Sequence, residues 1–130
     1  MTRLTEAAAR EVFELHALFV ELFTGRTRDF SRCEAAFAAA FEMVTPKGLR
    51  LTRAQILELF GKVRARADFR ITIHDIRSLR EDATSVLLQY VEEQYRDGET
   101  TRRLAVALFE TASHTPNGVA WRFLQETWIS

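Results

Sequence analysis

The second half of the chain alternates apolar and polar residues through three consecutive stretches, and this pattern constrains the fold more than any other feature. Turn signals separate the stretches, at Asp97-Gly98 and at Pro116-Asn117-Gly118. The residues before them carry the three-to-four spacing of amphipathic helices. Helices first and a strand meander last predict an α+β fold.

Composition limits the classes of function. The 130 residues suffice for one hydrophobic core, so we expect a single domain over residues 1–130. Lys and Arg number 18, as do Asp and Glu, and this balance argues against a nucleic-acid partner. The apolar runs are short, and the start at residues 1–6 does not resemble a signal peptide. We therefore expect no membrane partner and a cytoplasmic location.

The first half predicts helices with recognisable ends. Apolar residues recur on one helical stripe from Leu4 to Phe23, and Gly25 follows as a stop signal. Ser31-Arg32-Cys33-Glu34 fits a capping box and predicts a second, alanine-rich helix. Its expected buried side is Ala36, Phe37, Ala40 and Phe41.

A short strand and a third helix come next in this interpretation. Glu42-Met43-Val44 predicts the strand, and Pro46-Lys47-Gly48 predicts a turn after it. Thr52-Arg53-Ala54-Gln55 is a second capping box. The helix that it opens is expected to direct inward Ile56, Leu59, Phe60 and Val63.

The meander has a register that the charges support. If Asp97-Gly98 forms a two-residue hairpin, Glu92 lies opposite Arg103 and Glu93 lies opposite Arg102. In the preceding strand, between Phe69 and Leu79, the alternation changes phase at His74-Asp75, which predicts a β-bulge.

The last strand, from Val119 to Ile129, is apolar on both faces. We expect Trp121 and Phe123 on one face and Leu124 and Trp128 on the other. A sheet with two apolar faces is expected to carry helices on one side, and a second copy of the chain in a homodimer on the other.

In this order the elements resemble the nuclear transport factor 2-like superfamily, over roughly residues 11–130. The resemblance is carried by Asp29-Phe30, Phe37, Thr45-Pro46-Lys47-Gly48, the helix from Ala54 to Val63, and the ending from Trp121 to Ser130. It implies a cone in which N-terminal helices pack in the concave face of a curved, mostly antiparallel sheet. The SnoaL-like group of small proteins is the most similar in character.

Ketosteroid isomerase belongs to this superfamily, but its polar residues do not carry over to this chain. Its general base precedes proline in an Asp-Pro-x-Gly pattern, and Thr45 stands at that position here. Its oxyanion-hole tyrosine would fall near Phe19, and its late-strand acid near Phe109 or Glu110. We therefore do not expect ketosteroid isomerase activity.

The cone implied by the resemblance would hold an apolar pocket, and the hairpin register places candidate polar groups on one of its faces. Tyr90, Glu92 and Arg103 share that face, where a buried Glu92 would serve as an acid/base catalyst. The structural alternative, which we favour, is an exposed Glu92–Arg103 cross-strand ion pair. His74 and Asp75 offer a base beside a carboxylate only if the bulge reorients one of them.

The candidate ligand-binding residues are His16, Phe19, Arg103 and Trp121. His16 lies beside the main helical stripe, where it points either into the pocket mouth or to the surface, and we favour a surface or structural role. Trp121 serves either as a ligand clamp or as core, and we favour core. Either Gln125 or Glu126 points inward, depending on the loop before them.

The sequence contains no nucleophile elbow, phosphate loop or redox motif, and its histidines lack metal-ligand spacing. We therefore expect no cofactor and no metal, and we interpret the lone Cys33 as a small buried hydrophobic residue. The favoured function is a binding or accessory module with a pocket for a small apolar ligand. The alternatives are a cofactor-free lyase, isomerase or cyclase that uses Glu92, Tyr90, His74 or Asp75, and a pure oligomerisation module.

Overall fold

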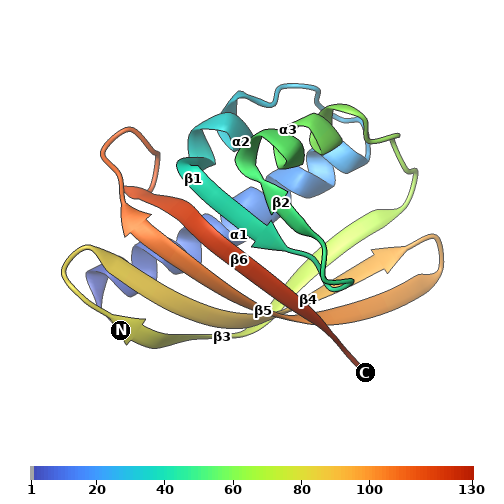
Figure 1. Cartoon of the computed structure of the whole chain (residues 1–130). Helices are drawn as coiled ribbons and strands as arrows, with labels where there is room; N and C mark the ends of the chain where they lie inside the picture. Colours follow the sequence, from blue (N-terminus) through green and yellow to red (C-terminus); the bar gives the residue numbers. More distant parts are fainter. Residues whose placement is uncertain (1) are drawn as a thin grey trace.

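A computed structural model of the chain describes residues 2–130. Its elements, labelled in Figure 1, are α1 (Arg3–Phe23), α2 (Ser31–Ala36), β1 (Phe37–Val44), β2 (Arg50–Thr52), α3 (Arg53–Gly61), β3 (Phe69–Glu81), β4 (Ser85–Arg96), β5 (Glu99–Thr111) and β6 (Val119–Ile129). The helices precede the four long strands, which confirms the α+β class predicted from the sequence.

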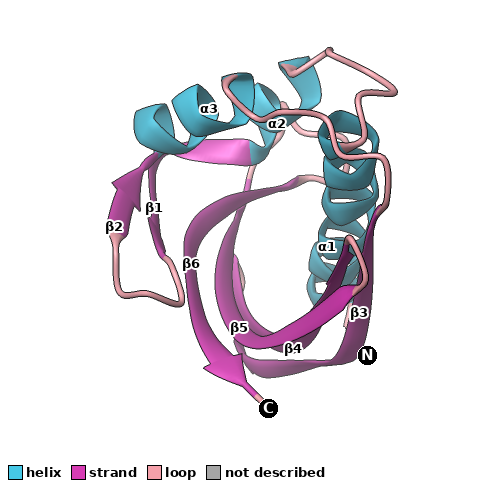
Figure 2. Ribbon diagram, turned by 90° about the vertical axis from the view of Figure 1, so that its right-hand side faces the viewer, coloured by secondary structure: helices cyan, strands magenta, loops and turns pink. Residues whose placement is uncertain are grey.

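The six strands form one curved sheet with the order β2-β1-β6-β5-β4-β3. β1 and β6 run parallel, and every other neighbouring pair is antiparallel. Figure 2 shows the sheet curling around α1, while α2 and α3 cover the end of the curl nearest β1. α1 packs against β3, β4 and β6. The expected arrangement of helices in the concave face of the sheet is therefore confirmed.

α1 follows its predicted stripe. Thr2 caps the helix by accepting a hydrogen bond from the Thr5 amide, and the stripe that includes Val12 and Leu15 is buried against the sheet. The chain leaves the helix through Gly25, whose φ of +76° is a left-handed conformation that favours glycine.

The predicted alanine-rich second helix is wrong beyond Ala36. α2 ends there, and Phe37 begins a strand that pairs with both β6 and β2. Phe37 and Phe41 are four residues apart, a spacing that places both on one side of a helix and also on one side of a strand. Pairing with β2 on one edge and with β6 on the other satisfies the backbone hydrogen-bonding groups of β1, and this favours the strand over the helix.

The capping box predicted at Ser31 is also wrong. Phe30 occupies the N-cap position of α2 and makes no side-chain capping bond. Ser31 lies inside the helix, and its amide and hydroxyl both donate to Asp29 Oδ1, at 3.0 and 2.7 Å.

The capping box at the start of α3 is confirmed, because Thr52 and Gln55 exchange reciprocal hydrogen bonds. Ile56 is buried as expected. Leu59 is 49% exposed, and Val63 is 36% exposed and lies beyond the helix end at Gly61. The prediction that Val63 points inward is therefore wrong, and Leu59 lines the central cavity without being buried in the core.

The hairpin register is confirmed over the whole β4–β5 ladder, with Glu92 opposite Arg103 and Glu93 opposite Arg102. The predicted bulge in β3 is confirmed too. The register shifts between His74 and Arg77, and Asp75 has a φ of +54°.

A bulge in β6 overturns the expected division of its side chains between the two faces of the sheet. Phe109 pairs with Trp121 and Leu108 with Phe123, so Arg122 is the extra residue. Trp121 therefore shares the concave face with Leu124 and not with Phe123, and both line the same cavity.

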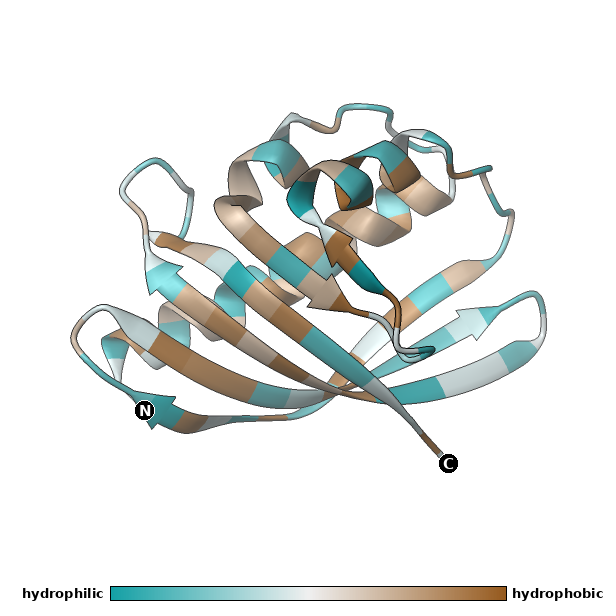
Figure 3. Cartoon of the chain, viewed as in Figure 1, coloured by the Kyte–Doolittle hydropathy of each residue, from teal (hydrophilic) through white to brown (hydrophobic). Residues whose placement is uncertain are grey.

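Hydrophobic and hydrophilic residues are distributed unevenly over the elements. In Figure 3 hydrophobic segments occupy much of the long strands, α1 mixes hydrophobic and hydrophilic residues, and the tip of the β4–β5 hairpin is hydrophilic. None of the described helices has the length and apolarity that a membrane span requires.

Candidate functional site

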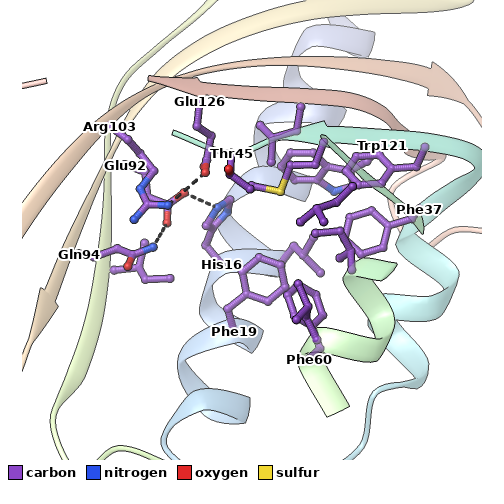
Figure 4. A pocket seen from close by; sticks show the side chains of 18 of the residues that line it. His16, Phe19, Phe37, Thr45, Phe60, Glu92, Gln94, Arg103, Trp121 and Glu126 are labelled. Carbon is purple, nitrogen blue, oxygen red and sulfur yellow. Dashed lines mark hydrogen bonds and ion pairs between the residues drawn. The ribbon is translucent and has the colours of Figure 1, made fainter. Parts of the chain in front are cut away.

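A cavity of about 230 Å³ lies between α1, α3, β1 and the concave face of the sheet. Figure 4 shows that its walls differ in character, with aromatic side chains on one side and a cluster of ionisable side chains on the other. The apolar walls are formed mainly by Leu15, Phe19, Phe23, Phe37, Phe41, Met43, Leu51, Ile56, Phe60, Ile71, Trp121 and Leu124. We call the other side, formed by His16, Glu92, Gln94, Arg103 and Glu126, the polar end.

His16 joins α1 to the sheet through a buried ion pair with Glu92. The Nδ1 atom of His16 is 2.7 Å from the carbonyl oxygen of Val12, and its Nε2 is 3.0 Å from Glu92 Oε1. A carbonyl and a carboxylate only accept hydrogen bonds, so both ring nitrogens carry hydrogen and the imidazole is a cation. His16 is 4% exposed and Glu92 3%.

The pKa values of the pair shift in the directions that this ion pair requires. Burial alone would lower the pKa of His16, but the charge and hydrogen bond of Glu92 outweigh it and raise the pKa above its ordinary 6.5. Burial alone would raise the pKa of Glu92, but His16, with help from Gln94 and Arg103, holds that pKa well below its ordinary 4.5. Both groups are therefore charged at neutral pH.

Gln94 fixes the orientation of the Glu92 carboxylate. Its Nε2 donates to Glu92 Oε2 at 2.6 Å, and its Oε1 accepts from Nη2 of Arg96 at 3.0 Å. Because Arg96 only donates, the direction of the Gln94 amide is set. A chain of hydrogen bonds therefore runs from an exposed guanidinium to the buried imidazolium.

A second buried pair completes the polar end. Nη1 of Arg103 donates to Glu126 Oε1 at 3.1 Å, and the Arg103 guanidinium lies over the ring of Trp128, 4.7 Å from its centroid. Burial and the nearby charge of Glu92 raise the pKa of Glu126 to about 7, against the opposing effect of Arg103. Glu126 is thus the carboxyl group of this cluster that changes protonation near neutral pH.

Two polar atoms in this region are buried and have no hydrogen-bond partner among the described residues: Arg103 Nε and the hydroxyl of Tyr90. The Tyr90 side chain is fully buried, and burial, reinforced by Glu92 and Glu126, raises its pKa well above 10. The phenol therefore stays protonated.

The Trp121 wall of the cavity is held by a residue that sequence reasoning did not single out. Glu11 on α1 is fully buried, and its Oε2 accepts from the Trp121 indole nitrogen at 3.0 Å. Its Oε1 accepts from Arg32 at 2.5 Å and from Asn117 at 3.0 Å. A buried Glu on the apolar stripe of a helix is the signal that would have pointed to this network.

The candidates predicted to bind a ligand, His16, Phe19, Arg103 and Trp121, all line the cavity. Glu92 lines it too, but the favoured interpretation of an exposed Glu92–Arg103 pair is wrong. The two residues are cross-strand neighbours as predicted, yet Glu92 pairs with His16, and Arg103 with Glu126. The cone encloses this part of the hairpin, which an isolated hairpin would leave in water.

His74 and Asp75 do not lie at the cavity. His74 is beside Glu93, with Nε2 3.8 Å from a carboxylate oxygen, on the face of the sheet opposite Glu92. Asp75 is exposed at the bulge.

Of the two candidates in β6, Glu126 is the residue that points inward. It is 5% exposed, whereas Gln125 is exposed.

Cys33 is fully buried, as predicted, and burial raises the pKa of its thiol to about 12. The described residues include no group of three or more His, Cys, Asp or Glu side chains placed to hold a metal ion.

Comparison with known proteins gives structural relatives. No family model matches the chain, and no curated protein matches it. An NTF-2-like protein of unknown function from Pseudomonas aeruginosa is 28% identical, with 95% of this chain and 99% of that chain covered and a TM-score of 0.83.

Two more distant structures share the fold. A CaMKII hub from S. rosetta is 12% identical, with 95% of each chain covered and a TM-score of 0.79. A ketosteroid isomerase-like protein from Erwinia carotovora atroseptica is also 12% identical, with 98% of this chain and 94% of that chain covered and a TM-score of 0.64. At these identities the likeness concerns fold and not chemistry.

The raised pKa of Glu126 can be measured by carbon NMR of its side-chain carboxyl group. We expect a titration midpoint near pH 7, with Glu92 still ionised there, because burial and Glu92 both disfavour the Glu126 anion. The folded chain then holds one more proton than the unfolded chain between the ordinary value of 4.5 and about 7, so this group's contribution to stability falls as pH rises through that window. A Glu126 midpoint below pH 5 would contradict this description.

Proposed function

The chain belongs to the nuclear transport factor 2-like superfamily, whose fold carries many activities, and we propose from its pocket that it binds a small ligand with a ring-sized apolar body and one hydrogen-bonding group. The observation that supports this most is the division of the cavity. Aromatic walls face a polar end at which Arg103 Nε, a buried donor, has no acceptor among the described residues. Arg103 lines the cavity and makes one side-chain hydrogen bond among the described residues, to Glu126, so a ligand oxygen at the polar end would accept from the guanidinium N–H groups that remain.

The cavity suits a compact ligand. About 230 Å³ is at or below the lower end of the size range of small-molecule sites, so a single ring with a short substituent fits better than a fused polycyclic body. The ring would contact Phe19, Phe60 and Trp121 at the aromatic walls. Ring-to-ring contacts of this kind add about 0.5–1.5 kcal/mol beyond the buried area.

The acid/base alternative depends on a different residue from those first considered. Glu92 is committed to His16, the phenol of Tyr90 stays protonated, and His74 and Asp75 lie away from the cavity. Glu126 has the pKa that proton transfer near neutral pH needs, so an enzymatic role would rest on it. Thr45 and Phe19, which line the cavity, offer no group equivalent to the isomerase base or phenol. Binding is therefore the preferred proposal.

The SnoaL-like character and the cytoplasmic location remain predictions, as does the homodimer. The outer face of β5 presents Leu104, Val106 and Leu108, which are only half-buried in the single chain. An apolar outer face would be covered in a homodimer, and in the pure assembly alternative this would be the chain's whole role.

Ligand binding can be tested with phenylacetamide, a neutral aromatic probe, by following backbone amide signals in proton–nitrogen NMR. We expect saturable shifts at residues that line the cavity, and at least a tenfold weaker interaction in Ile71→Trp. Ile71 is half-buried in β3 and lines the cavity, so an indole there fills the space. Thr72→Trp is the matched control, because Thr72 is the next residue and is exposed on the other face. Shifts that are not saturable, or that survive in Ile71→Trp, would count against a binding role for this cavity.

The homodimer can be tested by light scattering. We expect a mass twice that of the 15.0 kDa chain, reduced to one chain by Val106→Asp and left unchanged by Val63→Asp in the exposed segment after α3. A single-chain mass for the unmodified protein at high micromolar concentration would reject the dimer.

A further inference from the structure

The charges of the polar end balance. His16 and Arg103 are cations, and Glu92 and the ionised form of Glu126 are anions. All four are buried or nearly so, with Arg103 the most accessible at 12% of its side chain. A buried cluster of this kind tolerates no large excess of either sign, because the interior screens charge poorly.

The Arg103 guanidinium can donate further hydrogen bonds to an anion. Arg103 lines the cavity, and its guanidinium makes one hydrogen bond among the described residues, from Nη1 to Glu126, so further N–H groups are left for a ligand. A guanidinium binds a carboxylate through two parallel N–H donors when two are available. Trp128 stacks on the guanidinium and helps to hold its plane.

A carboxylate ligand at Arg103 would disturb the balance, since three carboxylates would then face two cations. Glu92 cannot readily take up a proton, because Nε2 of His16 and the Gln94 amide both donate to its oxygens. Glu126 can take up a proton, because among the described residues only Arg103 donates to its carboxylate. It is also the carboxyl group that Glu92 already disfavours as an anion.

We propose that the cavity binds the anion of a small aromatic or aliphatic carboxylic acid at Arg103, and that Glu126 takes up one proton from solvent as the anion binds. This inference rests on the proposed binding function and names its ligand class. No bond of the ligand changes: the only transfer is a proton from water or buffer to a Glu126 carboxylate oxygen.

The pH dependence follows from every ionisable group that faces Glu126. These are Glu92 on β4, Arg103 on β5 and His16 on α1, with the phenol of Tyr90 remaining neutral. Above about pH 7 Glu126 is ionised in the free protein, so carboxylate affinity falls about tenfold per pH unit. Below about pH 6 it is already protonated, and affinity levels off.

The test is calorimetric titration with phenylacetate at about pH 8, in HEPES and in Tris, whose heats of ionisation differ. We expect uptake of close to one proton per phenylacetate bound. In Glu126→Gln we expect no uptake and an affinity that does not vary with pH, because the amide still accepts from Arg103 but cannot ionise. Glu93→Gln, on the outer face of β4, is the matched control and is expected to behave as the unmodified chain.

Phenylacetamide, which has the same shape without the charge, separates this inference from the function on which it rests. Phenylacetamide binding without phenylacetate binding would overturn the carboxylate assignment and leave the binding function intact. Phenylacetate binding without proton uptake, or with uptake that persists in Glu126→Gln, would overturn the role of Glu126. Binding of neither probe would overturn both proposals.

Discussion

The buried ion pair between His16 and Glu92 is the interaction on which the arrangement of the pocket depends. It ties the middle of α1 to the middle of the sheet, at 3.0 Å and almost without solvent contact. Taking two charges out of water costs several kcal/mol per ion, and their attraction often does no more than offset that cost. Replacing a buried ion pair by apolar side chains of similar volume is often neutral or stabilising in proteins. The pair is therefore better explained by the chemistry of the cavity wall that it forms than by stability.

The rest of the polar end is arranged around this pair. Gln94 and Arg96 orient Glu92. Burial and the negative charge of Glu92 raise the pKa of Glu126, and Arg103 only partly offsets this rise. One carboxyl group is thus committed to the charged state and the other is left free to titrate. On the opposite side of the cavity the Glu11 network fixes Trp121, so that both ends of the pocket are held by buried polar contacts.

Features that depend on local chain chemistry could be predicted from the sequence. Asp97-Gly98 and the facing charges set the β4–β5 register, and the phase change at His74 located a bulge correctly. The local sequence could not decide whether Phe37 and Phe41 lie in a helix or in a strand, because their spacing fits both equally. Pairing with β6, which is distant in the sequence, makes the segment a strand.

The site was harder to predict because it is assembled from α1, β4, β5 and β6 by the closing of the cone. The hairpin register correctly placed Glu92 and Arg103 side by side, but only the fold shows that each takes another partner. The inward position of Glu126 depends on the loop and the bulge that precede it, and neither has a decisive sequence signal.

The state of the His16 ring tests the central claim most directly. Nitrogen NMR of the imidazole at about pH 7.5 reports whether each ring nitrogen carries hydrogen. We predict hydrogen on both Nδ1 and Nε2, and a single hydrogen, on Nδ1, in Glu92→Gln, where the stabilising charge is gone and the bond to Val12 remains. A neutral ring in the unmodified chain, with one nitrogen free of hydrogen, would contradict the ion pair and with it the charge balance of the pocket.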